Sequence, residues 1–206
     1  MALTLPLKKE GDVAPKLSLN LDKGAKFSVE LFWESEHDLD GHALLATNNG
    51  FGAKITDMAQ VLSTYNPGLP LADGSASSRK SGDKRPFMTP CGSLRHSGDA
   101  RTGIGATVDE IITIDGSLIP PGVNEIPIFV TIHPTHTAKF SQVTDAGIRI
   151  KDESGKILGE YILSNQFGEF DAVQMGSLIL GANGWSYEAA GSGFNGDFNA
   201  ILGYFQ

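Results

Sequence analysis

The sequence has one cysteine, Cys91, and no apolar run long enough to cross a bilayer. A single cysteine excludes an intrachain disulfide, which fits either a reducing compartment or a fold that needs no covalent cross-link. The first residues, Met1 to Leu7, lack the basic start and long apolar stretch of a signal peptide. We therefore expect a cytoplasmic protein that does not insert into membranes.

Basic residues are also scarce. The chain carries 16 Lys and Arg against 24 Asp and Glu, for a formal net charge of −8. Its strongest basic stretch, Arg79, Lys80, Lys84 and Arg85, is interrupted by Asp83, a composition more typical of a solvated loop than of a phosphate-binding patch. Since nonspecific nucleic-acid binding needs a basic face, we predict no nucleic-acid partner and consider cations the better match.

No combination of residues indicates an enzyme. Cys91 and His96 are close in sequence, but a thiol nucleophile requires a neighbouring base in space. Gly103 to Gly105 is a fragment of a dinucleotide-binding motif that precedes a predicted strand instead of a helix, so a Rossmann interpretation fails. His133 and His136 flank Pro134 and are either turn residues, which we favour, or ligands.

Glycine and short alternating segments dominate what is present. The 206 residues include 25 glycines and 10 prolines without a fixed period, which indicates many turns between short strands. Asn183-Gly184 lies between two such segments and predicts a hairpin, and the turn at 153–156 predicts another. We predict an all-β fold, a two-sheet antiparallel β-sandwich with long loops and short helical turns near 57–60 and 135–140. The predicted strands are 17–21, 26–33, 42–46, 61–65, 110–115, 125–133, 147–152, 157–163, 176–180 and 185–189.

The alternation along these strands predicts the core, and composition predicts the boundaries. Residues 66–93 are rich in proline and glycine and read as a loop insertion, while 1–14 read as an N-terminal arm ahead of a single domain at 15–206. Leu3, Leu5 and Leu7 alternate around Pro6, so the arm either contacts a partner subunit or folds back on its own sandwich. The predicted core residues are Phe27, Val29, Leu31, Ile112, Ile114, Phe129, Ile132, Ile148 and Ile150.

Two acidic clusters are the candidate cation sites. Glu36, Asp38 and Asp40 follow a predicted strand, and the last two point the same way on extended backbone. Several carboxylates in one loop suit calcium, although an Asx-rich turn ended by Gly41 explains the same residues. The second cluster places Asp99, Asp109 and Glu110 around several glycines.

Taken in order, these segments resemble the TerD family of tellurium-resistance and stress-response domains from about residue 15 to the C-terminus. The resemblance rests on the strand ending at Trp33, the acidic string 36–40, Tyr65-Asn66, and above all residues 98–110, which are similar to the family signature G-D-N-x-T-G-x-G-x-G-D-D-E. The resemblance implies a β-sandwich that holds calcium near its two acidic loops, with no established enzymatic step.

The signature departs from the family pattern at Ala100, Ala106, Thr107 and Val108. Because calcium affinity depends on ligand number and charge, we expect the first cluster to be the better site and the second the poorer one. We predict a non-enzymatic calcium-binding protein that works through protein partners or self-association. The alternative is a structural or decoration component of a phage particle, located in the virion, that reuses the fold with eroded calcium sites.

Overall fold

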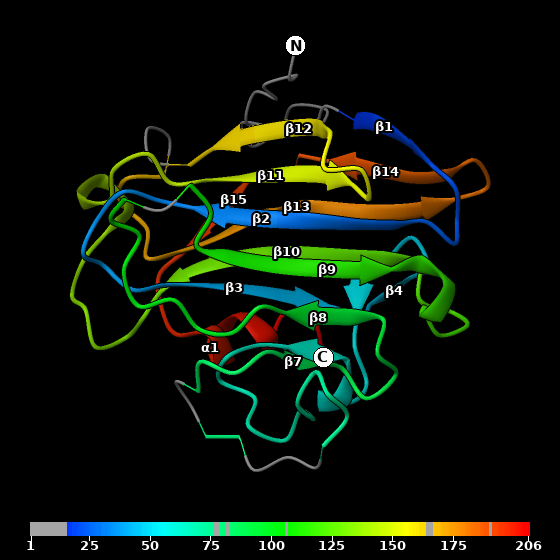
Figure 1. Cartoon of the computed structure of the whole chain (residues 1–206), viewed down its shortest axis with the longest axis horizontal. Coiled ribbons are helices and arrows are strands. Elements are labelled where there is room, and N and C mark those ends of the chain that lie inside the picture. The colour runs from blue at the N-terminus through cyan, green and yellow to red at the C-terminus, as the bar shows by residue number, and fades with distance from the viewer. Residues whose placement is uncertain (1–15, 76–78, 81–82, 106, 164–166, 190) are drawn as a thin grey trace.

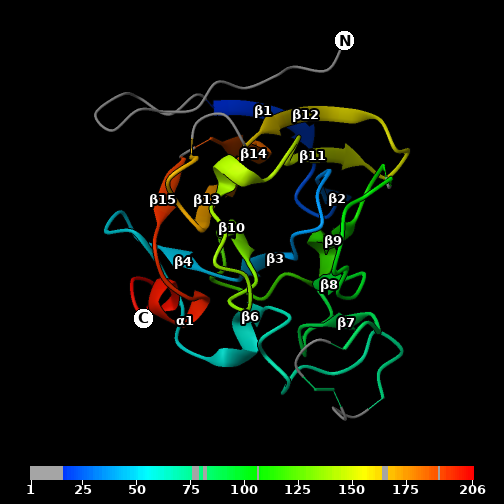
Figure 2. The ribbon, with the colours of Figure 1, turned by 90° about the vertical axis from the view of Figure 1, so that its left-hand side faces the viewer.

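The computed structural model describes residues 16–75, 79–80, 83–105, 107–163, 167–189 and 191–206. The predicted N-terminal arm and Ala106 lie outside this part of the chain, and so do a few residues of the 66–93 segment. Within it, antiparallel strands form two main sheets that face each other (Figures 1 and 2). The predicted two-sheet β-sandwich is therefore confirmed.

The first sheet has the order β1-β14-β13-β10-β3-β6, with β15 also paired to β13. Its strands are β1 (Lys16–Leu21), β3 (Leu39–Leu44), β6 (Val61–Leu62), β10 (Glu125–Ile132), β13 (Ala172–Gly181), β14 (Gly184–Glu188) and β15 (Ser192–Phe194). The predicted hairpin at Asn183-Gly184 joins β13 to β14, where Gly181 pairs with Gly184. Gly184 adopts a φ of +89°, a conformation that glycine tolerates without a steric cost.

The second sheet has the order β12-β11-β2-β9-β8-β7. Its strands are β2 (Lys26–Phe32), β7 (Phe87–Met88), β8 (Leu94–His96), β9 (Glu110–Asp115), β11 (Gly147–Asp152) and β12 (Ile157–Ile162). A separate two-stranded ribbon pairs β4 (Thr47–Asn48) with β5 (Ala53–Lys54). The predicted turn at 153–156 connects β11 and β12, which pair in antiparallel register.

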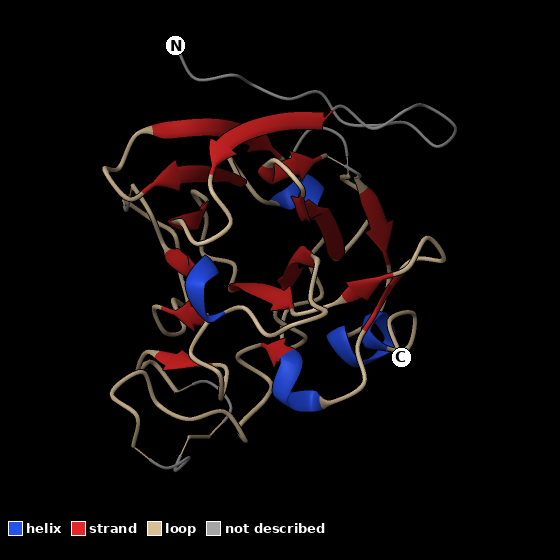
Figure 3. Ribbon diagram, turned by 90° about the vertical axis from the view of Figure 1, so that its right-hand side faces the viewer, coloured by secondary structure: helices blue, strands red, loops and turns tan. Residues whose placement is uncertain are grey.

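The helical segments are short (Figure 3). Among the described residues, three single 3₁₀ turns cover Met58–Gln60, Gly116–Leu118 and Phe140–Gln142, and one α-helix, α1, covers Phe198–Leu202. Asp57 caps the first turn by accepting a hydrogen bond from the Ala59 amide. No helix in the described part of the chain is long and apolar enough to cross a membrane.

The buried hydrophobic residues of the described chain form two clusters. The larger lies between the sheets and contains all the predicted core residues except Phe129. The smaller lies on the outer face of the first sheet, where α1 covers Leu44, Phe129 and Ala172. Phe129 is fully buried, as predicted, but in the smaller cluster: alternation along β10 turns it away from the neighbouring Ile128 and Val130 towards α1.

Candidate metal centre

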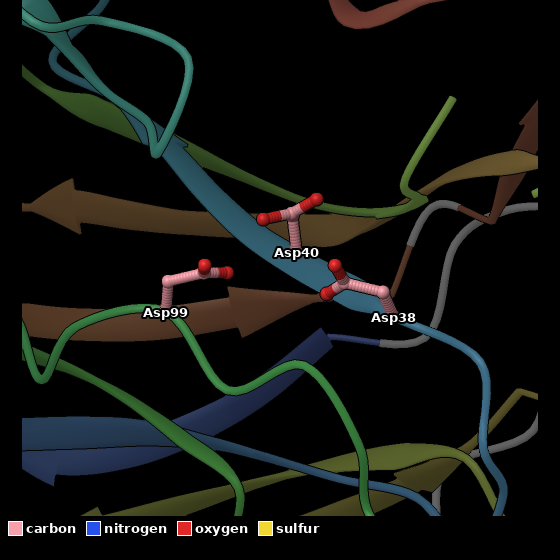
Figure 4. A group of neighbouring side chains, drawn as sticks. All are labelled: Asp38, Asp40 and Asp99. Carbon is pink, nitrogen blue, oxygen red and sulfur yellow. The ribbon is translucent and has the colours of Figure 1, made fainter. Parts of the chain in front are cut away.

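Asp38 directly precedes β3 of the first sheet, and Asp40 is the second residue of that strand. Asp40 pairs in register with Thr131 of β10, and the His133 amide donates a 2.8 Å hydrogen bond to the Asp38 carbonyl. These backbone contacts fix both residues at the beginning of a buried strand. Their carboxylates project to the same side, as the period of two of a β-strand requires (Figure 4).

Asp99 reaches the same place from the second sheet, on the loop between β8 and β9 (Figure 4). The preceding Gly98 has a φ of +106°, and a Cβ atom there would lie 2.0 Å from the carbonyl oxygen of Lys84. Only glycine permits this close approach of the two backbone segments. As a result, one carboxylate oxygen from each of Asp38, Asp40 and Asp99 lies within 4.8 Å of the others.

Asp40 is held by two hydroxyl donors. Thr64 Oγ1 donates a 2.7 Å hydrogen bond to Oδ1, and the Tyr65 hydroxyl donates to Oδ2. Asp40 is fully buried. Burial first, and the charge of Glu110 second, raise the pKa of Asp40 to about 8, against the lowering effect of the two hydroxyls. The fold therefore orients this carboxylate firmly in surroundings that disfavour its ionised form.

Asp38 is buried with an oxygen that is not hydrogen-bonded. The residue is 7% exposed, and its Oδ1 has no hydrogen-bond partner among the described residues. Burial raises the pKa of Asp38, the charges of Asp99 and Glu110 raise it further, and His133 and His136 act in the opposite direction. A buried acceptor without a donor is costly. Asp38 Oδ1 is therefore a candidate ligand for a cation or an ordered water molecule.

The cluster opens into a cleft with a volume of about 510 Å³. Glu36 lines this cleft together with Asp38 and Asp99, and Arg101, His133, Thr135 and His136 form the rest of its wall. Arg101 pairs with Asp99 across 3.5 Å, and His133 Nδ1 lies 2.8 Å from Thr135 Oγ1. Glu36 is thus placed beside the cluster at the cleft, and both histidines lie next to the acidic site on a turn of the chain.

Asp109 and Glu110, by contrast, support the backbone. Asp109 Oδ2 accepts a 2.9 Å hydrogen bond from the Trp33 amide. Glu110 accepts from the Gly41 amide at 2.8 Å and from the Ala100 amide at 3.2 Å. Glu110 therefore joins the strand that carries Asp40 to the loop that carries Asp99. The candidate ligands form one group assembled from both acidic segments instead of the two separate groups expected from the sequence.

Arg79 corrects a second expectation. It belongs to the basic stretch interpreted as a solvated loop, and Lys80, Lys84 and Arg85 are indeed exposed. Arg79 is only 4% exposed and lies over the Phe87 ring, with its guanidinium carbon 3.6 Å from the ring centroid. A pattern of charges along a loop does not reveal which one turns inward.

Cys91 and His96 have separate surroundings. The Cys91 sulfur lies 3.0 Å from Ser93 Oγ and 3.4 Å from Thr89 Oγ1. His96 Nε2 lies 3.3 Å from Glu110 Oε2, and its ring stacks on Phe87 with centroids 4.7 Å apart. These contacts engage His96 in the support of the acidic cluster.

A family model and individual proteins of known sequence both match this chain, and both are TerD-type or stress proteins. A family model described as the TerD domain matches residues 86–205, more than half of the sequence. Tellurium resistance protein TerD of Serratia marcescens is 31% identical over 208 residues, which cover 97% of this chain and 95% of that protein. General stress protein 16U of Bacillus subtilis is 34% identical over 113 residues, 53% of this chain and 58% of that protein.

A solved structure supports the fold independently. The crystal structure of a homologue of telluride resistance protein TerD from Streptomyces coelicolor A3(2) superposes with a TM-score of 0.62 and 19% identity, covering 86% of this chain and 95% of that one. The match to the Bacillus protein spans less than two thirds of its length. The names of these relatives refer to tellurium resistance and stress, and none refers to a virion.

Proposed function

Because the chain belongs to the TerD family, we propose that it is a calcium-binding protein that serves in stress or tellurium resistance and holds one ion between Asp38, Asp40 and Asp99. The observation that carries this proposal is the buried Oδ1 of Asp38, which lacks a hydrogen-bond partner in the described part of the chain and belongs to a group of three carboxylates. A cation at this point would supply the missing partner of Asp38. It would also favour the ionised form of Asp40, whose pKa is raised first by burial and then by the charge of Glu110.

The donor set favours calcium over softer metals. All three candidate ligands are carboxylates, the oxygen donors that hard cations prefer, and no cysteine takes part. Calcium takes about six to eight oxygen ligands, more than three aspartates supply with one oxygen each. The open cleft beside the cluster has room for water molecules to complete the shell, and Glu36 is placed to contribute through one of them.

We also propose that the protein acts by binding and not by catalysis. The buried carboxylates are fixed by hydrogen bonds from Thr64 and Tyr65, an arrangement that suits a constant ligand geometry. The relatives' names describe resistance and stress roles without a reaction. The phage-particle alternative finds no support in these names.

Association with protein partners, in the cytoplasm, is the route by which we propose that the domain acts. The association is supported by the alternation of Leu3, Leu5 and Leu7 in the N-terminal arm, residues 1–14, and the cytoplasmic location by the single cysteine. Deletion of residues 1–12 is expected to leave thermal unfolding of the domain nearly unchanged and to abolish self-association measured by light scattering. A truncated protein that associates as well as the full chain would exclude the arm as the contact.

Calorimetric titration with calcium tests the cation site. We expect one binding event per chain, and a loss of at least about tenfold in affinity in Asp38→Asn and in Asp99→Asn, because each removes a charged ligand. Asp109→Asn is the matched control, since its side chain keeps an oxygen that can accept from the Trp33 amide. The proposal fails if the native protein binds no calcium, or if the control loses as much affinity as the two ligand variants.

A further inference from the structure

The segment between the two halves of the metal centre contains one buried charge, Arg79. It lies in the 66–93 segment, ahead of β7, and its side chain is enclosed. One of its terminal nitrogens, NH2, donates hydrogen bonds to the carbonyl oxygens of Ser63 at 3.0 Å, Thr64 at 2.8 Å and Asn66 at 3.2 Å. A single guanidinium nitrogen thus holds a whole turn of backbone.

That turn carries both donors to Asp40. The Asn66 amide donates to the Ser63 carbonyl at 3.1 Å, which closes the turn, and the side chains of Thr64 and Tyr65 project from it to the two oxygens of Asp40. Arg79 donates hydrogen bonds to three backbone carbonyl oxygens that converge on its guanidinium. Its position therefore determines where the two hydroxyl donors lie.

On its other side, Arg79 is connected to the Asp99 loop through a series of side-chain contacts. The guanidinium stacks on Phe87, which stacks on His96 at an interplanar angle of 18°. His96 lies against Glu110, and Glu110 accepts the hydrogen bond of the Ala100 amide, next to Asp99. The contacts of Arg79 consequently extend to both carboxylates, one from each sheet.

We propose that Arg79 is a positioning residue for the cation site, which sets the separation of Asp40 and Asp99 through the Ser63–Asn66 turn on one side and the Phe87–His96 stack on the other. This inference rests on the proposed function. The inference gives the 66–93 segment a role. Because Arg79 belongs to this segment, calcium affinity should depend on how the Arg79 side chain packs against the rest of the domain.

The positive charge of Arg79 should affect calcium affinity in the opposite direction to its positioning role. Burial lowers the pKa of Arg79, while the charges of Asp83 and then Asp99 favour its charged form, so the guanidinium is within electrostatic reach of Asp99. A nearby positive charge repels a calcium ion, so removing it would raise affinity if electrostatics governed the outcome. Removing the hydrogen bonds would lower affinity if positioning governs it. The two interpretations therefore predict changes in opposite directions.

The experiment compares Arg79→Lys and Arg79→Met with the native protein by calcium calorimetry, together with thermal unfolding in a chelator. Lysine keeps the charge but has neither the planar stacking surface nor the geometry to hold three carbonyls. We expect both variants to lose about tenfold or more in calcium affinity, the range seen when groups that orient metal ligands are removed.

Arg149→Lys is the matched control. Arg149 also stacks on a phenylalanine, with its guanidinium carbon 3.9 Å from the Phe32 ring centroid, and pairs with Glu160 at 2.6 Å on the second sheet. Its loss should lower the unfolding temperature without changing calcium affinity. This comparison separates positioning from a general loss of stability.

Three outcomes decide between the interpretations. Native affinity in Arg79→Lys, or increased affinity in Arg79→Met, overturns the inference and leaves the calcium proposal intact. Failure of the native protein to bind calcium overturns both. If the Arg79 variants do not fold, Phe87→Leu removes the stacking surface while keeping apolar volume, and unchanged calcium affinity in that variant overturns the inference.

Discussion

The Tyr65 hydroxyl donates a hydrogen bond to Oδ2 of Asp40, while Thr64 Oγ1 donates to Oδ1 at 2.7 Å. Two consecutive residues thus hold the two oxygens of one buried carboxylate. Such partners orient a metal ligand and hold it in the binding geometry before the ion arrives.

Tyr65→Phe is therefore expected to weaken calcium binding by about tenfold while leaving one binding event per chain. Calorimetric titration measures the change. Tyr204→Phe is the control, because Tyr204 is 69% exposed and follows α1 near the C-terminus. Equal affinity in Tyr65→Phe and the native protein would show that Thr64 alone is enough to orient Asp40.

Asp38→Asn is expected to raise stability when calcium is absent. Burial and the charge of Asp99 raise the pKa of Asp38, so its ionised form is unfavourable in the folded protein. A neutral amide of the same shape removes this repulsion. We expect an unfolding temperature higher by roughly 2–4 °C in a chelator, corresponding to about 1 kcal/mol for a domain of this size.

The same variant should lose the stabilisation that calcium gives. Binding to the folded state alone stabilises a protein in proportion to the logarithm of ligand concentration over Kd. Calcium should therefore raise the unfolding temperature of the native protein and have little effect on Asp38→Asn. Calorimetric scans with and without calcium make the comparison, and equal calcium-dependent shifts in both proteins contradict it.

Much of the fold is encoded by local pattern. Alternation along 27–33 and 110–115 predicts strands that the structure confirms as neighbouring β2 and β9, with Val29 opposite Ile112. The Asn183-Gly184 turn also predicts its hairpin, because the required backbone conformation is local. Phe129 is buried as predicted but not between the sheets: it shares its face of β10 with Glu125 and Thr131, whereas Ile132 lies on the opposite face.

The helix α1 was not predicted, although its sequence contains a signal. Asp197 caps it by accepting from the Ala200 amide, and Phe198, Ile201 and Leu202 have the spacing of one helical face. Five residues are too few for this periodicity to stand out. The helix depends on tertiary contacts, including the stacking of Phe198 on His42 with centroids 4.0 Å apart.

The acidic residues of the candidate site could be predicted from the sequence, but which of them lie together in the folded protein could not. Asp38 and Asp40 are adjacent by strand geometry, whereas Asp99 joins them only because the two sheets face each other. Asp109 and Glu110 look equivalent to Asp99 in sequence, but their carboxylates accept backbone hydrogen bonds. Which acid supports the fold and which faces the cleft is decided by tertiary packing.

Two buried tyrosines provide a matched test of hydrogen bonding in the core. Tyr187 donates a 2.6 Å hydrogen bond to the Met175 carbonyl, while the Tyr161 hydroxyl is buried without a partner in the described part of the chain. Tyr187→Phe should lower the free energy of unfolding by about 1 kcal/mol, and Tyr161→Phe should leave it unchanged or raise it. Urea denaturation measures both, and a larger loss in Tyr161→Phe would contradict the assignment.

Gly98 and Gly105 test whether the approach of the 66–93 segment to Asp99 is required for the site. Both have positive φ angles, +106° and +75°, so alanine is strained at either position. A Cβ on Gly98 would lie 2.0 Å from the Lys84 carbonyl oxygen, whereas one on Gly105 meets nothing within 4 Å. Both variants therefore share the conformational cost, and only one adds a collision.

We expect Gly98→Ala to lower the unfolding temperature more than Gly105→Ala and to weaken calcium binding, because the collision displaces Asp99 from Asp38 and Asp40. Gly105→Ala should bind calcium as the native protein does. Thermal unfolding in a chelator and calcium calorimetry on the same samples separate the two effects. If Gly98→Ala is less stable yet binds calcium with native affinity, Asp99 holds its place without the packing of Lys84 against Gly98, and the loop contributes stability only.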